Sequence, residues 1–295
     1  MPSLLIDVDS TIPNLALMHI SAWRKTEGDE VGFYVSDPDK VYASCIFDWN
    51  RHKTDGLKFL YPRAELNVGG SRIDLKTSPM IPAETWLKMP DYSLYPDCDY
   101  DPGFTTRGCV RRCHFCVVPE KEGALRVVQH PREFHEPKHK KVMLLDNNIL
   151  ASRSWFFEVA DWIISNRLKV DFNQGLDIRL VDREIAEKIA ELKPIDNWRI
   201  AFDSMAYREE LEHGLRELGR AGVNLRHKTM AYVYVHDGEQ VDDAVKRCNI
   251  LRTYGVMPYP MINRHAEKTA EITALKRWCR PWIFYTTEWE DYRRN

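Results

Sequence analysis

The sequence has no apolar run as long as the roughly 18 residues that cross a bilayer. Residues 1–7, Met-Pro-Ser-Leu-Leu-Ile-Asp, also lack the basic segment and the cleavage site of a secretory signal. Neither sign of charge prevails, since 42 Lys and Arg residues oppose 44 Asp and Glu residues and give a formal net charge of −2. This balance argues against a broadly cationic surface that binds nucleic acid, but it is compatible with a local basic site. We therefore expect a cytoplasmic protein with no membrane partner.

Cysteine is scarce, and its distribution does not favour a disulfide framework. The chain has seven cysteines in 295 residues, an odd number, and three of them fall within residues 109–116. Such clustering is typical of metal ligation in a reducing compartment. The other four, which show no ligand spacing, are Cys45, Cys98, Cys248 and Cys279.

The first part of the chain has the pattern of a small α/β domain. Strand-like residues 4–8, 31–35 and 41–47 alternate with a helix-like stretch at residues 13–26. Residues from about 62 to 103 are rich in proline and contain Gly69-Gly70, which predicts a linker.

From residue 104 onward, strand and helix signals alternate. The strands are apolar on both faces, which is typical of buried parallel strands, and we predict them at residues 141–147, 169–173, 198–203, 229–235 and 256–262. Asp182 is expected to cap one intervening helix, and Gly222 and Gly255 to end the next two. With a further strand near residues 103–106, about six βα units predict a partial (β/α)6 barrel resembling a TIM barrel.

The cysteine loop has the spacing Cys109-x3-Cys113-x2-Cys116. Three thiolates can hold three irons of a [4Fe–4S] cluster and leave the fourth open for an external ligand. The alternative is structural zinc, which usually takes four closed ligands. His114 adjoins Cys113 too closely to serve easily as the fourth, and no second Cys-x2-Cys pair follows.

This loop resembles that of the radical S-adenosylmethionine (SAM) superfamily, C-x3-C-x-aromatic-C, with Phe115 at the aromatic position. The resemblance implies that Cys109, Cys113 and Cys116 hold the cluster, that SAM chelates the open iron, and that an electron cleaves SAM. The resulting 5′-deoxyadenosyl radical would abstract hydrogen from a substrate that the sequence does not identify. The resemblance further implies an external electron donor such as a flavodoxin or ferredoxin.

Polar side chains follow several predicted strands, where a barrel gathers its ligands. In the superfamily, the SAM amino group is bound after the strand that here ends in Asp146, Asn147 and Asn148, and this segment resembles an Asp-rich variant of that motif. Gln174 and Arg179 follow the next strand and can hydrogen-bond ribose or a carboxylate. Ser204 follows the strand after that. The alternative is ordinary loop polarity and helix capping.

The resemblance extends to domain organisation. Residues 1–75 are similar to a shortened cobalamin-binding-like domain of the flavodoxin-like α/β type, followed by a linker at 76–103 and a barrel at 104–295. The motif D-x-H-x-x-G, which supplies a histidine to cobalt, is absent because residues 6–12 contain no histidine. We therefore expect no bound cobalamin.

Two alternatives stay open. One is a cobalamin-dependent radical SAM methyltransferase, because some relatives bind cobalamin without that histidine. The other is a non-catalytic iron–sulfur or zinc module that binds nucleic acid through Arg107, Arg111, Arg112 and the basic residues 138–141.

Overall fold

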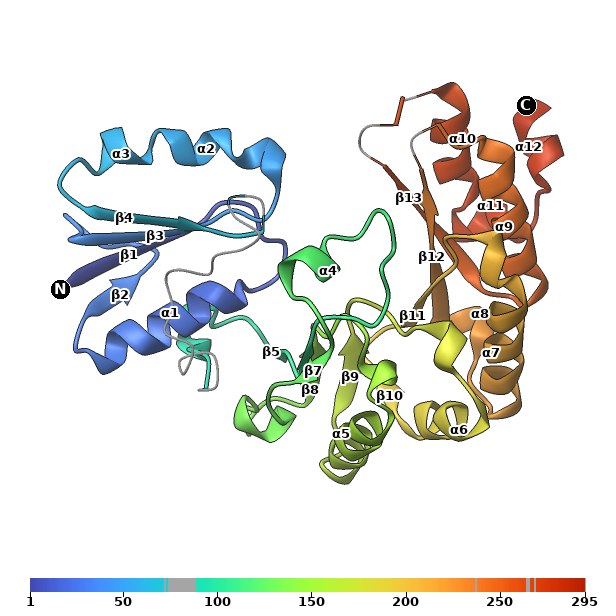
Figure 1. Cartoon of the computed structure of the whole chain (residues 1–295), viewed down its shortest axis with the longest axis horizontal. Helices are drawn as coiled ribbons and strands as arrows, with labels where there is room; N and C mark the ends of the chain where they lie inside the picture. The colour runs from blue at the N-terminus through green and yellow to red at the C-terminus, as the bar shows by residue number, and fades with distance from the viewer. Residues whose placement is uncertain (72, 74–88, 237, 264–265, 268, 295) are drawn as a thin grey trace. The chain divides into compact units, whose positions relative to one another are not determined.

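The structure is a computed structural model that describes residues 1–71, 73, 89–236, 238–263, 266–267 and 269–294. It divides into two compact units, residues 1–146 and 147–295, and each is described here by itself. Both combine helices with mainly parallel strands (Figure 1), which confirms the α/β class. In the described ranges, no helix is long and apolar enough to cross a membrane. Most of the predicted linker, residues 74–88, lies outside those ranges, and the domain boundaries at 75 and 103 stay predictions.

The first unit begins with a parallel sheet in the order β2-β1-β3-β4. Its strands are β1 (Pro2–Asp7), β2 (Glu30–Gly32), β3 (Lys40–Ser44) and β4 (Glu65–Gly69). Figure 1 shows helix α1 (Leu15–Thr26) on one face of this sheet, and the short helices α2 (His52–Asp55) and α3 (Leu57–Leu60) on the other. The sheet is thus covered on both sides, as parallel sheets require.

Helix α1 packs through the apolar stripe that the sequence predicted. Leu17 and Ile20 are buried in one cluster with Leu5 of β1 and Tyr42 of β3. The helix starts one residue after its cap Asn14, whose side chain accepts a hydrogen bond from the Leu17 amide, rather than at Pro13. Burial of this stripe fixes the helix against the sheet.

The rest of the first unit carries the cysteine loop. Strand β5 (Asp101–Gly103) pairs in parallel with β8 (Lys141–Leu144). Strand β6 (Thr106–Arg107) pairs antiparallel with β7 (Arg126–Val127), so the predicted single strand at 103–106 is two short strands. The hairpin of β6 and β7 encloses the three cysteines and helix α4 (Val118–Lys121). Short 3-10 turns, which precede or follow these strands, lie at Tyr92–Leu94 and Pro131–Glu133.

The second unit contains the remaining βα repeats. Strand β9 (Lys169–Phe172) pairs in parallel with β10 (Lys193–Pro194). Strands β11 (Trp198–Ala201), β12 (Thr229–Val235) and β13 (Met257–Ile262) form a second parallel sheet in sequence order. A bridge between Leu176 and Ile200 links the segment after β9 to β11. All the predicted strands of this unit are present, and β9 and β11 end one and two residues before their predicted ends.

Helices alternate with these strands as the βα pattern predicts, and three more follow β13. They are α5 (Arg153–Ser165), α6 (Arg183–Glu191), α7 (Arg208–Arg220), α8 (Leu225–Lys228), α9 (Val241–Thr253), α10 (Ala270–Trp278), α11 (Pro281–Phe284) and α12 (Trp289–Arg294). The Asp182 cap of α6 is confirmed, because its carboxylate accepts a hydrogen bond from the Ile185 amide. Gly222 and Gly255, which follow α7 and α9, have the positive φ angles of helix-ending glycines.

The prediction of two apolar faces was wrong for β12. Its buried and half-buried residues alternate, with Ala231, Val233 and Val235 on the buried face and Tyr232 and Tyr234 on the half-buried one. In Figure 1 helices α7, α9 and α10 lie on a single side of β11, β12 and β13. The half-buried face carries Met230, Tyr232 and Tyr234, and a tyrosine suits such a face because it combines an apolar ring with a polar hydroxyl.

Gly214 allows α7 to approach the segment that follows β9. A Cβ atom at this position would lie 2.6 Å from the carbonyl oxygen of Ile178, in the 3-10 turn Ile178–Leu180. Gly219 on the same helix would place a Cβ 3.6 Å from Leu225, an ordinary contact. A side chain at position 214 would therefore clash with the backbone, whereas a side chain at position 219 would fit.

We predict opposite effects for alanine at these positions. Gly214→Ala should lower the free energy of unfolding by about 1–3 kcal/mol, because it overpacks backbone against backbone. Gly219→Ala should raise it by about 0.5–1 kcal/mol, because alanine is the better helix former. Urea denaturation of both variants measures the difference. Equal effects would show that the close approach at Ile178 does not constrain the fold.

Candidate functional site

The three clustered cysteines line one cavity in the first unit. Cys109, Cys113 and Cys116 border a hollow of about 900 Å3 inside the loop between β6 and β7. The other lining residues are Val110, Arg112, Pro119, Glu120, Gly123, Ala124 and Leu125. Three soft donors therefore border one space, whose remaining wall combines apolar residues with one arginine and one glutamate.

Backbone contacts close the neck of this loop. The Cys109 amide donates to the Gly123 carbonyl at 3.3 Å. Gly108 has a φ of 79°, and a Cβ there would lie 2.2 Å from the Ala124 carbonyl oxygen, so only glycine fits. The Gly108 amide also donates to Glu122 at 2.9 Å, and the Arg107 guanidinium lies 3.3 Å from the same carboxylate. These contacts hold the two ends of the cysteine segment together.

Desolvation raises the pKa of the Cys116 thiol above its ordinary value, and the neighbouring Cys113 and Cys109 raise it further. Because metals bind the thiolate form, loading this loop would release protons.

In the described part of the chain, no group of three or more His, Cys, Asp or Glu side chains is placed to hold a metal ion.

Phe115 lies beside the cysteines but does not line their cavity as the structure describes it. Its side chain is 38% exposed, and its ring meets the His114 ring edge-on at a centroid distance of 5.1 Å. Its predicted contact with a cofactor stays a prediction.

Asp146 joins the end of β8 to the segment that enters the cysteine loop. The carboxylate is buried at 4% exposure and accepts hydrogen bonds from the Thr105 amide at 3.1 Å and from the Thr105 and Thr106 hydroxyls at 2.6 and 2.5 Å. The Thr106 amide donates to it as well. Burial raises the pKa of Asp146, and these hydrogen bonds oppose that rise. We infer that Asp146 positions the loop.

In the second unit, polar residues at the strand ends form a connected network. The Asn148 amide donates to Asp177 at 3.0 Å, and the Arg179 guanidinium donates to the same aspartate at 2.6 Å. Arg179 also lies over the Tyr207 ring, 4.7 Å from its centroid. The predicted residues Asn148 and Arg179 are thus brought together by Asp177.

The network extends to Asp203, a polar residue at the end of the next predicted strand, and to Tyr207, which the sequence did not single out. The Tyr207 hydroxyl accepts a hydrogen bond from the Asp203 amide at 2.5 Å, and the Asp203 carboxylate accepts one from the Tyr234 amide at 2.9 Å. Burial raises the pKa of Asp203, and burial together with Asp203 raises that of Tyr207 to about 12. No local signal distinguishes Tyr207, because its role depends on Arg179 lying above its ring.

The other predicted residues lie outside these contacts. Gln174 is exposed and donates to Asn173 at 3.1 Å. Ser204 is exposed and caps the turn Met205–Tyr207 by accepting from the Ala206 amide. Asn147 is half-buried. Their cofactor contacts stay predictions, and capping explains Ser204 by itself.

Comparison with known proteins adds no assignment: no family model matches the chain, and no curated protein matches it either.

We predict that Asp146→Asn lowers the free energy of unfolding by about 1–3 kcal/mol, because the amide NH2 replaces one of the two oxygens that accept from Thr105 and Thr106 and cannot itself accept. The matched control is Asp99→Asn, which removes an exposed carboxylate paired with Lys141 and should cost less than about 1 kcal/mol. Urea denaturation provides the comparison. Similar losses in the two variants would contradict the anchoring role of Asp146.

Proposed function

We propose that this protein is a radical SAM enzyme whose cysteine loop holds a [4Fe–4S] cluster through Cys109, Cys113 and Cys116. The observation that carries the proposal is that the three thiols line one cavity of about 900 Å3 within a closed loop. Their spacing in the sequence is that of the superfamily motif. The shared cavity and the cysteine spacing together support the cluster better than either feature does alone.

The residues present fit a cluster. The donor set is three soft thiols, and the cavity that they line is larger than a single ion needs. When bound, such a cluster would supply the electron for reductive cleavage of SAM, followed by hydrogen abstraction from a substrate. Arg112 also lines the cavity and would offset the negative charge of a thiolate-bound cluster.

The strand-end network is the proposed place for SAM or substrate groups. Arg179 presents a planar guanidinium, and its orientation is fixed by Asp177 on one side and the Tyr207 ring on the other. Such an arginine can bind a carboxylate bidentately. Asn147, Asn148, Gln174 and Ser204 would add amide and hydroxyl groups. Asp146 would contribute indirectly, because it positions the cysteine loop and does not line the cavity.

The finer fold assignment is also a proposal. The order β2-β1-β3-β4 is that of the first strands of a flavodoxin-like sheet, and β11, β12 and β13 are parallel and sequential, as in a partial (β/α)6 barrel. An external flavodoxin or ferredoxin would supply electrons.

We propose that the front domain acts without cobalamin. Ligands of such sheets bind at the switch point, here between β1 and β3. The Asp9 carboxylate bridges that crevice by accepting hydrogen bonds from the Ile46 and Phe47 amides at 2.8 and 2.9 Å. A large ligand would have to displace these contacts.

We predict about four irons per chain after anaerobic reconstitution. Replacing Cys109, Cys113 and Cys116 together by alanine should abolish iron binding, because the variant lacks every proposed ligand. Cys98→Ala, which changes a cysteine outside the loop, should retain it. Iron analysis and visible absorbance test both. Stoichiometric zinc without iron–sulfur absorbance in the anaerobically purified protein would overturn the cluster assignment.

We also predict that Arg179→Ala and Asn147→Ala weaken SAM binding by about tenfold and leave iron content unchanged. Arg183→Ala, which removes an exposed arginine paired with Glu187 on α6, is the control and should bind SAM normally. Equilibrium binding to the reconstituted protein measures the affinities. Unchanged affinity in both test variants would move the SAM site elsewhere.

A further inference from the structure

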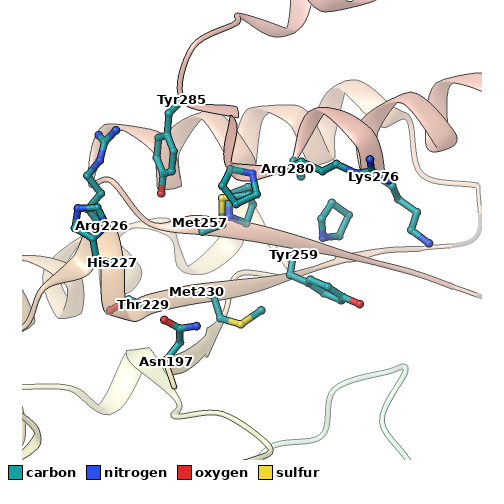
Figure 2. Close-up of a pocket in the computed structure, with 14 residues that line it drawn as sticks. Asn197, Arg226, His227, Thr229, Met230, Met257, Tyr259, Lys276, Arg280 and Tyr285 are labelled. Atoms are coloured by element: carbon teal, nitrogen blue, oxygen red, sulfur yellow. The ribbon is translucent and has the colours of Figure 1, made fainter. Parts of the chain in front are cut away.

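A second cavity lies at the opposite ends of the strands in the second unit. Asn197 precedes β11, Thr229 opens β12 and Met257 opens β13, and all three line a hollow of about 660 Å3. Figure 2 shows Lys276, Arg280 and Tyr285 bordering it from the helical side. The size falls within the range of small-molecule pockets. It shares no residue with the strand-end network.

The rim of this cavity is cationic. Arg226, His227, Lys276 and Arg280 line it, and no Asp or Glu is found among the described lining residues. No carboxylate of the described ranges lies within ion-pair distance of Arg226, Lys276 or Arg280. Other arginines of this unit do pair with carboxylates: Arg153, Arg179, Arg199, Arg208, Arg247 and Arg252. Positive charge is thus left uncompensated here, which favours an anionic ligand.

The wall between these cations is apolar and aromatic. Tyr259 is 55% exposed and lies beside Met230 and Met257 (Figure 2). The Tyr285 ring is fixed by its hydroxyl, which donates to the Gly255 carbonyl at 2.7 Å, and the Arg226 guanidinium lies 4.4 Å from its centroid. Flat rings beside arginine planes are surfaces on which nucleobases stack.

Thr229 also lines the cavity; it is 2% exposed, and its hydroxyl has no hydrogen-bond partner among the described residues. Buried hydroxyls in folded proteins nearly always have a partner. Asn197 adds an amide that can both donate and accept.

We propose that this cavity binds a nucleotide, with its phosphate on Lys276 and Arg280 and its base against Tyr259. A single carboxylate needs fewer cations than line this rim, whereas a phosphate monoester carries nearly two negative charges. The nucleotide is either a free one or a unit of a single-stranded nucleic acid, since both offer the same phosphate and base. The proposal is independent of SAM chemistry.

The experiment measures equilibrium binding of AMP, adenosine, inorganic phosphate, SAM and a uridylate decamer RNA to the full chain at about 50 mM salt. AMP or the RNA should bind saturably and more tightly than the other three ligands. Adenosine lacks the phosphate, inorganic phosphate lacks the base, and SAM carries a positive charge. Tighter binding of the RNA than of AMP assigns the site to nucleic acid, and equal binding assigns it to free nucleotide.

Charge-removing variants locate the binding. Lys276→Gln and Arg280→Gln should each weaken it about tenfold, as loss of a charge-assisted hydrogen bond does. Arg277→Gln is the matched control, because Arg277 is an exposed neighbour on α10 that does not line the described cavity. Absence of AMP and RNA binding, phosphate binding as tightly as AMP, or an equal loss in Arg277→Gln would overturn the proposal. None of these readouts depends on iron or SAM turnover.

Discussion

A buried carboxylate connects the sheet of the first unit to its cysteine loop. Asp146 at the end of β8 accepts hydrogen bonds from both the amides and the hydroxyls of Thr105 and Thr106, directly before the hairpin that carries the cysteines. A buried carboxylate is costly unless its oxygens are well paired, and here donors from two residues pair them. The position of Thr106 sets the start of β6, and β6 sets one side of the loop. The cysteine cavity thus depends on a residue that does not line it.

The loop itself is closed by a second, smaller set of contacts. Gly108 permits a backbone approach to Ala124 that no Cβ allows, and Glu122 accepts from the Gly108 amide while it pairs with Arg107. A short segment with a closed neck can present several thiols to one space with little loss of backbone entropy on binding. This pre-formed arrangement suits a loop that must hold a ligand through side chains only a few residues apart.

Charge is distributed differently at the two ends of the strands in the second unit. At the carboxyl ends, Arg179 is held by Asp177, and Arg247 pairs with Glu239. At the amino ends, Lys276 and Arg280 border a cavity that has no carboxylate among its described lining residues. Paired arginines are oriented and nearly neutral as a group, whereas unpaired cations retain their attraction for anions. The first arrangement favours positioning, and the second favours capture of a charged ligand.

The sequence by itself determined the features that depend on neighbouring residues. Apolar runs placed the strands of the second unit, Asp182 and Gly222 marked helix ends, and the cysteine spacing identified the loop. What the tertiary structure decided depends on residues far apart in the chain. It turned Asp146 toward Thr105, placed Tyr207 beneath Arg179, and gathered Asn197, Arg226, Met257 and Arg280 around one cavity. Local periodicity fixes which face of an element is apolar, but only packing determines which polar side chains meet across it.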